Sequence, residues 1–189
     1  MNEGRFEPGQ GVATARPAAA RPALASPQPA APRALYTPEQ RARRDATVWT
    51  LVQGILAPLQ FVVFAVSLAL VVRYLLTGAG YEAATASILL KTAVLYTIMV
   101  TGAIWEKVVF GQYLLAPAFF WEDVVSFGVI ALHTAYVYAV VSGAWGPGIE
   151  MAIALAAYAA YVVNAAQFVW KLRQARRAAP AALPDEVPA

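Results

Sequence analysis

The amino-acid sequence predicts an all-α integral membrane protein, a four-helix bundle with both termini in the cytoplasm. Of its 189 residues, 60% are hydrophobic and 13% are charged, whereas a soluble domain carries about 25% charged residues. The apolar residues form four runs of about twenty residues, the length with which a helix crosses roughly 30 Å of hydrocarbon. The positive charges gather near the two ends of the chain, which is typical of a membrane protein with cytoplasmic termini.

The two ends of the chain are predicted to be disordered tails. Residues 1–35 are rich in proline and alanine and hold almost no large apolar side chain, so burial cannot offset the entropy that folding would remove. Residues 178–189 are again rich in proline and alanine. We therefore expect one folded domain, residues 36–177.

Helical order is predicted to begin at Thr37. The run Thr37-Pro38-Glu39-Gln40 combines an N-cap hydroxyl, a proline at the first helical position and a glutamine at the capping-box position. Pro58 is expected to kink the first of the spans that follow. The predicted spans are residues 49–72, 84–105, 124–142 and 149–170, and a basic segment, residues 171–177, closes the last one.

The tryptophans and the cations indicate how the spans are oriented. Every tryptophan falls at a predicted span end, where its amphipathic ring favours the headgroup level. Lys107 lies in the middle loop, while the two opposite loops hold only Arg73 among cations. The positive-inside rule therefore places both termini and the 106–123 loop in the cytoplasm. The tryptophans are Trp49, Trp105, Trp121, Trp145 and Trp170.

Composition excludes several classes of function. The chain has no cysteine, which rules out disulfides, thiolate nucleophiles, Cys-ligated zinc and iron–sulfur clusters. A net charge of +3 confined to the termini is too small for a nucleic-acid partner. No phosphate-binding glycine loop or catalytic serine motif is present. The lipid bilayer is thus the partner that the composition itself predicts.

Polar residues inside the spans are the informative exceptions, because each must be satisfied within the protein. Gln53, Gln60 and Ser67 recur every seven residues and share one helix face. Asn164 and Gln167 lie three residues apart on the last span. Hydrogen bonds between helices explain such residues without any ligand, and a contact of Gln60 with a substrate is the alternative.

Lys91 and His133 are two further candidate residues within the spans, and both side chains are ionisable. Lys91 must pair, snorkel to the outer face or meet a polar cavity. His133 follows Glu122 by eleven residues, so the two point in nearly the same direction, about 16 Å apart along the helix. A lone histidine is either a packing residue or an axial ligand for a metal in a flat macrocycle. The lack of companion ligands argues against a free metal-ion site.

The densest group of candidate site residues brackets the middle loop. Gly111 and Pro117 predict a turn or a re-entrant hairpin there. Carboxylates at the membrane interface are either merely solvated or, where aromatic residues surround them, kept protonated near neutral pH. Two such groups on facing helices could divide the roles of acid and base. The group comprises Trp105, Glu106, Lys107, Phe119, Phe120, Trp121, Glu122 and Asp123.

Several long runs of the sequence resemble the 3-vinyl bacteriochlorophyllide hydratase family of bacteriochlorophyll biosynthesis. The resemblance extends over about residues 36–177 and leaves out the proline-rich start. The runs are YTPEQRARRD (36–45), WTLVQG (49–54), APLQF (57–61), TGAIWEKVVFG (101–111) and APAFFWED (116–123).

The resemblance implies hydration of the C3 vinyl group of a chlorophyllide or bacteriochlorophyllide, with no cofactor, in a bacterial cytoplasmic or intracytoplasmic membrane. Our hypothesis makes Glu106 or Glu122 the proton donor, and Asp123 or the remaining glutamate the base that activates water. Lys107 would pair with the substrate's propionate and His133 would ligate its magnesium. Further expected substrate contacts are Trp105, Phe120, Trp121, Lys91 and Gln60.

Two other readings of the sequence are open. The protein could bind or assemble a tetrapyrrole without changing it, using the aromatic loop and His133. It could also be a small membrane scaffold whose polar residues serve only helix packing. An oligomer, and contacts with neighbouring enzymes of the pathway, are compatible with either reading or with the enzyme.

Overall fold

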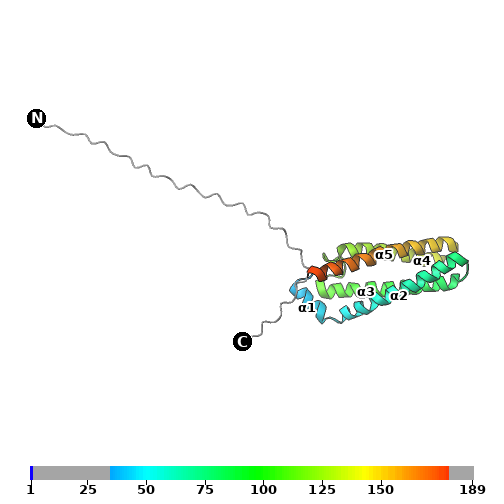
Figure 1. Cartoon of the computed structure of the whole chain (residues 1–189), viewed down its shortest axis with the longest axis horizontal. Helices are drawn as coiled ribbons and strands as arrows, with labels where there is room; N and C mark the ends of the chain where they lie inside the picture. The colour runs from blue at the N-terminus through cyan, green and yellow to red at the C-terminus, as the bar shows by residue number, and fades with distance from the viewer. Residues whose placement is uncertain (2–34, 179–189) are drawn as a thin grey trace. The chain divides into compact units, whose positions relative to one another are not determined.

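The computed structural model describes Met1 and residues 35–178, and this part of the chain is helical, as predicted (Figure 1). The predicted tails lie almost entirely outside the described residues. One short helix precedes four long ones. The helices are α1 Pro38–Ala46, α2 Val48–Thr77, α3 Tyr81–Phe110, α4 Phe120–Ser142 and α5 Pro147–Ala178.

Helix α1 begins where the capping signal predicts. The Thr37 side chain accepts a hydrogen bond from the backbone N–H of Gln40 at 3.2 Å, and the Gln40 side chain accepts one from the N–H of Thr37 at 2.9 Å. These reciprocal bonds satisfy two backbone donors that the first helical turn leaves free. Helix α1 is therefore anchored immediately before the first long helix.

The four long helices are each long and apolar enough to cross a membrane. Every predicted span lies inside one of them, but the helices extend beyond the apolar stretches; α5, for example, continues through the basic residues 171–177. Backbone hydrogen bonding does not depend on apolar side chains, and lysine, arginine and glutamine are good helix formers. Pro58 lies within α2, which continues on both sides of it.

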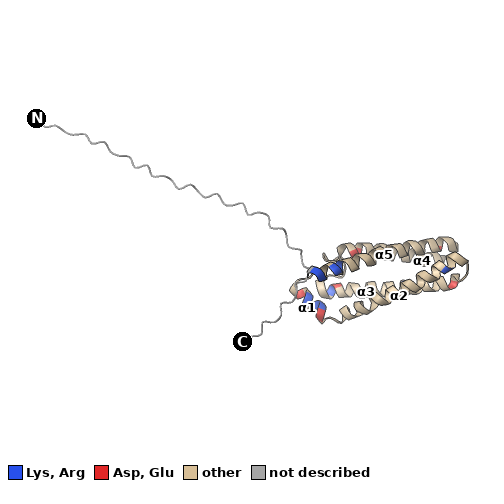
Figure 2. Cartoon of the chain, in the orientation of Figure 1, with Lys and Arg blue, Asp and Glu red and all other residues tan. Residues whose placement is uncertain are grey.

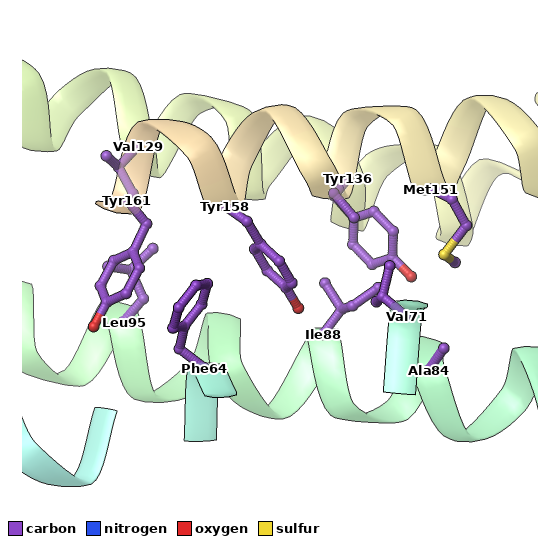
Figure 3. Close-up of a cluster of buried hydrophobic side chains, with 11 residues drawn as sticks. Phe64, Val71, Ala84, Ile88, Leu95, Val129, Tyr136, Met151, Tyr158 and Tyr161 are labelled. Atoms are coloured by element: carbon purple, nitrogen blue, oxygen red, sulfur yellow. The ribbon is translucent and has the colours of Figure 1, made fainter. Parts of the chain in front are cut away.

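The long helices pack as two hairpins, α2 with α3 and α4 with α5. Gly78 and Gly80, both with positive φ, close the first hairpin over a short turn. Between the hairpins lies a shared core of aromatic and aliphatic side chains, in which Phe64 packs against the Tyr158 and Tyr161 rings (Figure 3). Inside a bilayer, close packing of these large rings stabilises the association of the helices through van der Waals contacts.

Charged residues gather at one end of the helices. Figure 2 shows lysine and arginine concentrated where α1 and the last turns of α5 lie, together with acidic residues. The loop between α3 and α4, residues 111–119, belongs to the same end. This end of the protein carries the candidate site.

Candidate functional site

Three carboxyl groups are buried at the charged end of the helices. Glu106 lies in the last turns of α3, and Glu122 and Asp123 lie in the first turn of α4. Their exposed fractions are 5%, 7% and 3%, respectively. The solvated alternative that the sequence allowed therefore does not describe these acids.

The loop between α3 and α4 donates backbone hydrogen bonds to two of the three acids. The N–H of Leu115 donates to Asp123 Oδ2 at 2.7 Å, and the N–H of Ala116 donates to Glu106 Oε2 at 3.3 Å. Gly111 makes this path possible, because it ends α3 with a φ of 88° that a side chain disfavours. Consecutive N–H groups thus hold one carboxyl from each side of the loop.

Because consecutive N–H groups of the loop bond to them, the buried carboxyl groups of Glu106 and Asp123 lie close to each other. Two full negative charges this close, away from water, would repel each other strongly. Repulsion therefore favours a state in which the Glu106–Asp123 pair holds a single proton.

Glu122 has a different partner, Lys171 of α5, with which it forms an ion pair. The Lys171 ammonium also donates to the carbonyl oxygen of Ala118 and lies 5.1 Å from the centre of the Phe119 ring. Sequence reasoning missed this lysine as a site residue and assigned it only to the basic segment. Its position directly after Trp170, at a span end, is the only sequence signal that it meets the interface.

The predicted aromatic residues divide into two groups. Trp105 is half-buried, donates to Thr50 Oγ1 at 2.9 Å and packs edge-on against Phe119. Phe120 and Trp121, in contrast, are 40% and 69% exposed. Trp105 therefore braces the loop from inside, whereas Phe120 and Trp121 face outward.

Tyr36 completes the inner aromatic cluster from the start of the described chain. Its ring stacks on Phe110 with 5.8 Å between the centres and lies 6.5 Å from the Phe119 ring. Burial raises the pKa of Tyr36, although the nearby Arg44 guanidinium opposes the rise. The Tyr36 hydroxyl therefore stays neutral. The aromatic cluster to which Tyr36 belongs packs against Phe119, at the end of the loop between α3 and α4.

A cleft of about 190 Å³ opens beside Glu122. Sites that enclose a whole drug-sized ligand measure about 300–1,000 Å³, so this cleft suits a side arm of a larger molecule. Its walls come from the start of α4 and the last turns of α5, and they are Glu122, Gln167, Trp170, Lys171 and Gln174.

The remaining predicted site residues lie away from the acids. Lys107 is exposed and donates to the carbonyl oxygen of Gly111 at 2.8 Å. Gln60 is buried, and its side-chain oxygen has no hydrogen-bond partner among the described residues. Lys91 and His133 bond each other at 2.6 Å deep in the core. Lys91 therefore does not snorkel, and an axial role for His133 would require Lys91 to leave its ring nitrogen.

The predicted interhelical hydrogen bonds form for three of the five polar span residues, whereas the side-chain oxygens of Gln60 and Gln167 have no partner among the described residues. Gln53 donates to Thr101 Oγ1 at 2.8 Å, which joins α2 to α3. Ser67 and the Tyr158 hydroxyl bond at 2.5 Å, which joins α2 to α5. Asn164 donates to Ser126 Oγ at 2.8 Å. These residues serve packing of the helices.

The arrangement of the acids can transfer protons in a site with little water. One carboxyl of the pair can give a proton while the other takes one, and the loop N–H groups stabilise whichever is charged. Among residues 35–178, no group of three or more potential ligands stands ready to hold a metal ion. The chemistry that the carboxyl pair itself can support is acid–base catalysis.

Comparison with known proteins identifies similar chains. A family profile described as 2-vinyl bacteriochlorophyllide hydratase (BCHF) matches residues 36–174. A protein named 2-vinyl bacteriochlorophyllide hydratase from Cereibacter sphaeroides is 77% identical over 144 residues, which cover 76% of this chain and 89% of the relative. One of the same name from Rhodobacter capsulatus is 76% identical over 144 residues, covering 76% and 84%. No solved structure matches the chain.

Proposed function

Because the chain belongs to the 2-vinyl bacteriochlorophyllide hydratase family, we propose that it adds water to the vinyl group of a bacteriochlorophyllide or chlorophyllide. The product carries a 1-hydroxyethyl group, and the activity is that of a hydro-lyase in bacteriochlorophyll biosynthesis. The vinyl group carries the number 2 in the family name and the number 3 above, and both numbers denote the same vinyl substituent of the macrocycle.

The observation that carries the mechanism is the pair of buried carboxyl groups, Glu106 and Asp123, which adjacent N–H groups of one loop hold. The protonated carboxyl gives its proton to the terminal vinyl carbon. The π electrons of the vinyl group form the new C–H bond, and the cation left beside the ring is spread over the conjugated macrocycle. Water then adds to the vinyl carbon that is attached to the ring and that carries the positive charge. The added water loses a proton to the other carboxylate. The pair ends with one proton, as it began.

The ion pair of Glu122 with Lys171 supports Glu106 or Asp123, rather than Glu122, as the proton donor. The carboxylate of Glu122 is already engaged by the Lys171 ammonium. Glu122 instead lines the cleft beside Lys171. Among the residues that the sequence hypothesis offered, the ion pair of Glu122 therefore favours Glu106 and Asp123 as the acid and the base.

The protein is proposed to be a multi-pass protein of the bacterial inner membrane, with both termini and the 111–119 loop on the cytoplasmic side. The concentration of lysine and arginine at the end that holds α1 and the last turns of α5 supports this orientation (Figure 2). The substrate would then meet the acid pair at the inner headgroup level. A flat apolar macrocycle can reach that depth from within the bilayer.

Hydration is tested with membranes that contain this protein and no other pathway enzyme. They are incubated with the vinyl pigment in water enriched in ¹⁸O, and the mass of the product is measured by mass spectrometry. Incorporation of one labelled oxygen together with loss of the vinyl absorption is the expected result. Pigment that binds but emerges unchanged would favour the non-enzymatic reading, and membranes without the protein are the control.

A further inference from the structure

We propose that Lys171 and the cleft beside Glu122 bind the carboxylate side arm of the tetrapyrrole substrate. This inference rests on the proposed function. A bacteriochlorophyllide is by its name the free acid of the pigment, so it carries a carboxylate that a hydratase must accommodate. The sequence hypothesis gave this task to Lys107. The structure favours Lys171, for the following reasons.

The Lys171 ammonium has a hydrogen-bond donor to spare. An ammonium group has three donors, and two of them are taken by Glu122 and the carbonyl oxygen of Ala118. The Lys171 side chain is 25% exposed and lines the cleft. It can therefore reach a third acceptor without giving up either of its present partners.

Gln167 offers a second polar group in the same cleft. Its side-chain oxygen is buried and has no hydrogen-bond partner among the described residues. A buried amide left unsatisfied is costly. A half-turn of the amide brings its NH₂ group to the same position, where it can donate to a carboxylate. The cleft thus pairs a cation with a neutral donor, the combination that a carboxylate needs.

The size of the cleft and its surroundings fit a side arm. A volume of about 190 Å³ admits a short carboxylic acid chain but not the macrocycle. Trp170, which also lines the cleft, is 68% exposed and offers a flat apolar surface beside it. The macrocycle can lie there, in the hydrocarbon, while its charged arm stays at the headgroup level.

The cleft is also next to the acid pair. Glu122, which lines the cleft, directly precedes Asp123 of the pair in α4. A substrate held by its carboxylate at Lys171 is therefore fixed close to the groups that act on its vinyl arm. Lys107 does not share this position, since it is exposed and bonded to Gly111 at the end of α3.

The test compares binding of vinyl bacteriochlorophyllide with binding of its methyl ester, which lacks the negative charge. Kd is measured for both by quenching of tryptophan fluorescence in detergent, for the full chain and for Lys171→Met. The expected wild-type preference for the free acid is about tenfold or more, as for a hydrogen bond to a charged group. In Lys171→Met the two ligands should bind almost equally.

The controls separate charge at the site from charge elsewhere. Arg173→Gln removes a nearby exposed cation of α5 that does not line the cleft, and it should keep the wild-type preference. Glu122→Gln/Lys171→Met removes both partners of the ion pair and guards against misfolding caused by an unpaired carboxylate. The double variant should lose the preference as Lys171→Met does.

Equal affinity of the wild type for acid and ester would overturn the inference, and that measurement needs no variant. So would a preference that survives Lys171→Met, or one that disappears in Lys107→Met but not in Lys171→Met. Hydration is assayed in parallel with both ligands. A preference for the free acid without any hydration would refute the proposed function and leave the carboxylate site standing.

Discussion

Lys91 of α3 donates a hydrogen bond to Nε2 of His133 in α4, and both side chains are fully buried. His133 Nδ1 lies 2.7 Å from the carbonyl oxygen of Val129, which can only accept. Nδ1 therefore carries the hydrogen, and Nε2 has the lone pair that receives Lys91. The ammonium also lies 4.1 Å from the centre of the Tyr161 ring. This contact joins the two hairpins in the middle of the apolar core.

Replacing one partner of this pair should destabilise the protein more than replacing both. His133→Leu leaves the Lys91 ammonium buried without its acceptor, and the expected loss in free energy of unfolding is about 3 kcal/mol. Lys91→Met/His133→Leu should recover most of that loss. Unfolding in mixed micelles is measured for His133→Leu, Lys91→Met and the double variant, and additive effects would show that the two residues do not interact.

Activity should depend on both members of the acid pair. Glu106→Gln and Asp123→Asn keep the shape of the side chains but remove the shared proton or its acceptor. Hydration should fall by about 10²–10⁴-fold in each, the range that acid–base groups contribute. The assay follows loss of vinyl absorption, with thermal unfolding as a check on folding. Near-normal turnover in either variant would discard the pair as the catalytic centre.

Glu122→Gln should have a smaller effect on the chemical step than either change in the pair. Its carboxylate is tied to Lys171 and is not needed to give or take the proton. A reduction in kcat of less than about tenfold is expected, well below the general acid–base range. The comparison is made by steady-state kinetics on the same substrate, and a loss as large as that of Glu106→Gln would make Glu122 the donor.

Gly111→Val should disturb the site through the backbone. Gly111 has a φ of 88°, and a Cβ atom added there would meet no atom of a non-neighbouring residue within 4 Å. The cost of a side chain at this position is therefore conformational and not steric. It is expected to be about 1–2 kcal/mol in stability. The loop carrying the Leu115 and Ala116 donors should then shift, and hydration should decrease. Gly128→Val, within α4 and also facing open space, is the control for added bulk.

The orientation can be checked by labelling single cysteines, because the chain has none of its own. Gln112→Cys places a thiol in the exposed loop between α3 and α4, and Ala144→Cys places one in the exposed turn between α4 and α5. In intact cells a membrane-impermeant maleimide should label position 144 and spare position 112. Lysis should expose both, and the reverse pattern would invert the proposed topology.

The fold was largely predictable because the signals that determine it are local. Runs of apolar residues define the long helices, and Thr37 with Gln40 defines the start of α1. Glu106 and Asp123 could likewise be chosen as candidates, since charged residues next to apolar segments are unusual.

The partners of these residues could not be predicted, because they depend on how distant segments meet. Lys171 reaches Glu122 only when the end of α5 returns beside the start of α4, and Lys91 reaches His133 only across the two hairpins. Lys107 was predicted to pair with the propionate as a cation at the interface, and the sequence did not reveal that its exposed side chain bonds to the carbonyl oxygen of Gly111. The helical periodicity of the sequence placed His133 on the same helix face as Glu122. It did not reveal that Lys91 bonds to Nε2 of His133.

The loop between α3 and α4 both connects the two hairpins and supplies the N–H groups that hold Glu106 and Asp123. Glu106 comes from the first hairpin and Asp123 from the second. A nascent chain that has inserted only its first half therefore contains one acid without its counterpart. With this pair as the proposed catalytic centre, a chain that has inserted only its first hairpin is expected to be inactive toward the pigment.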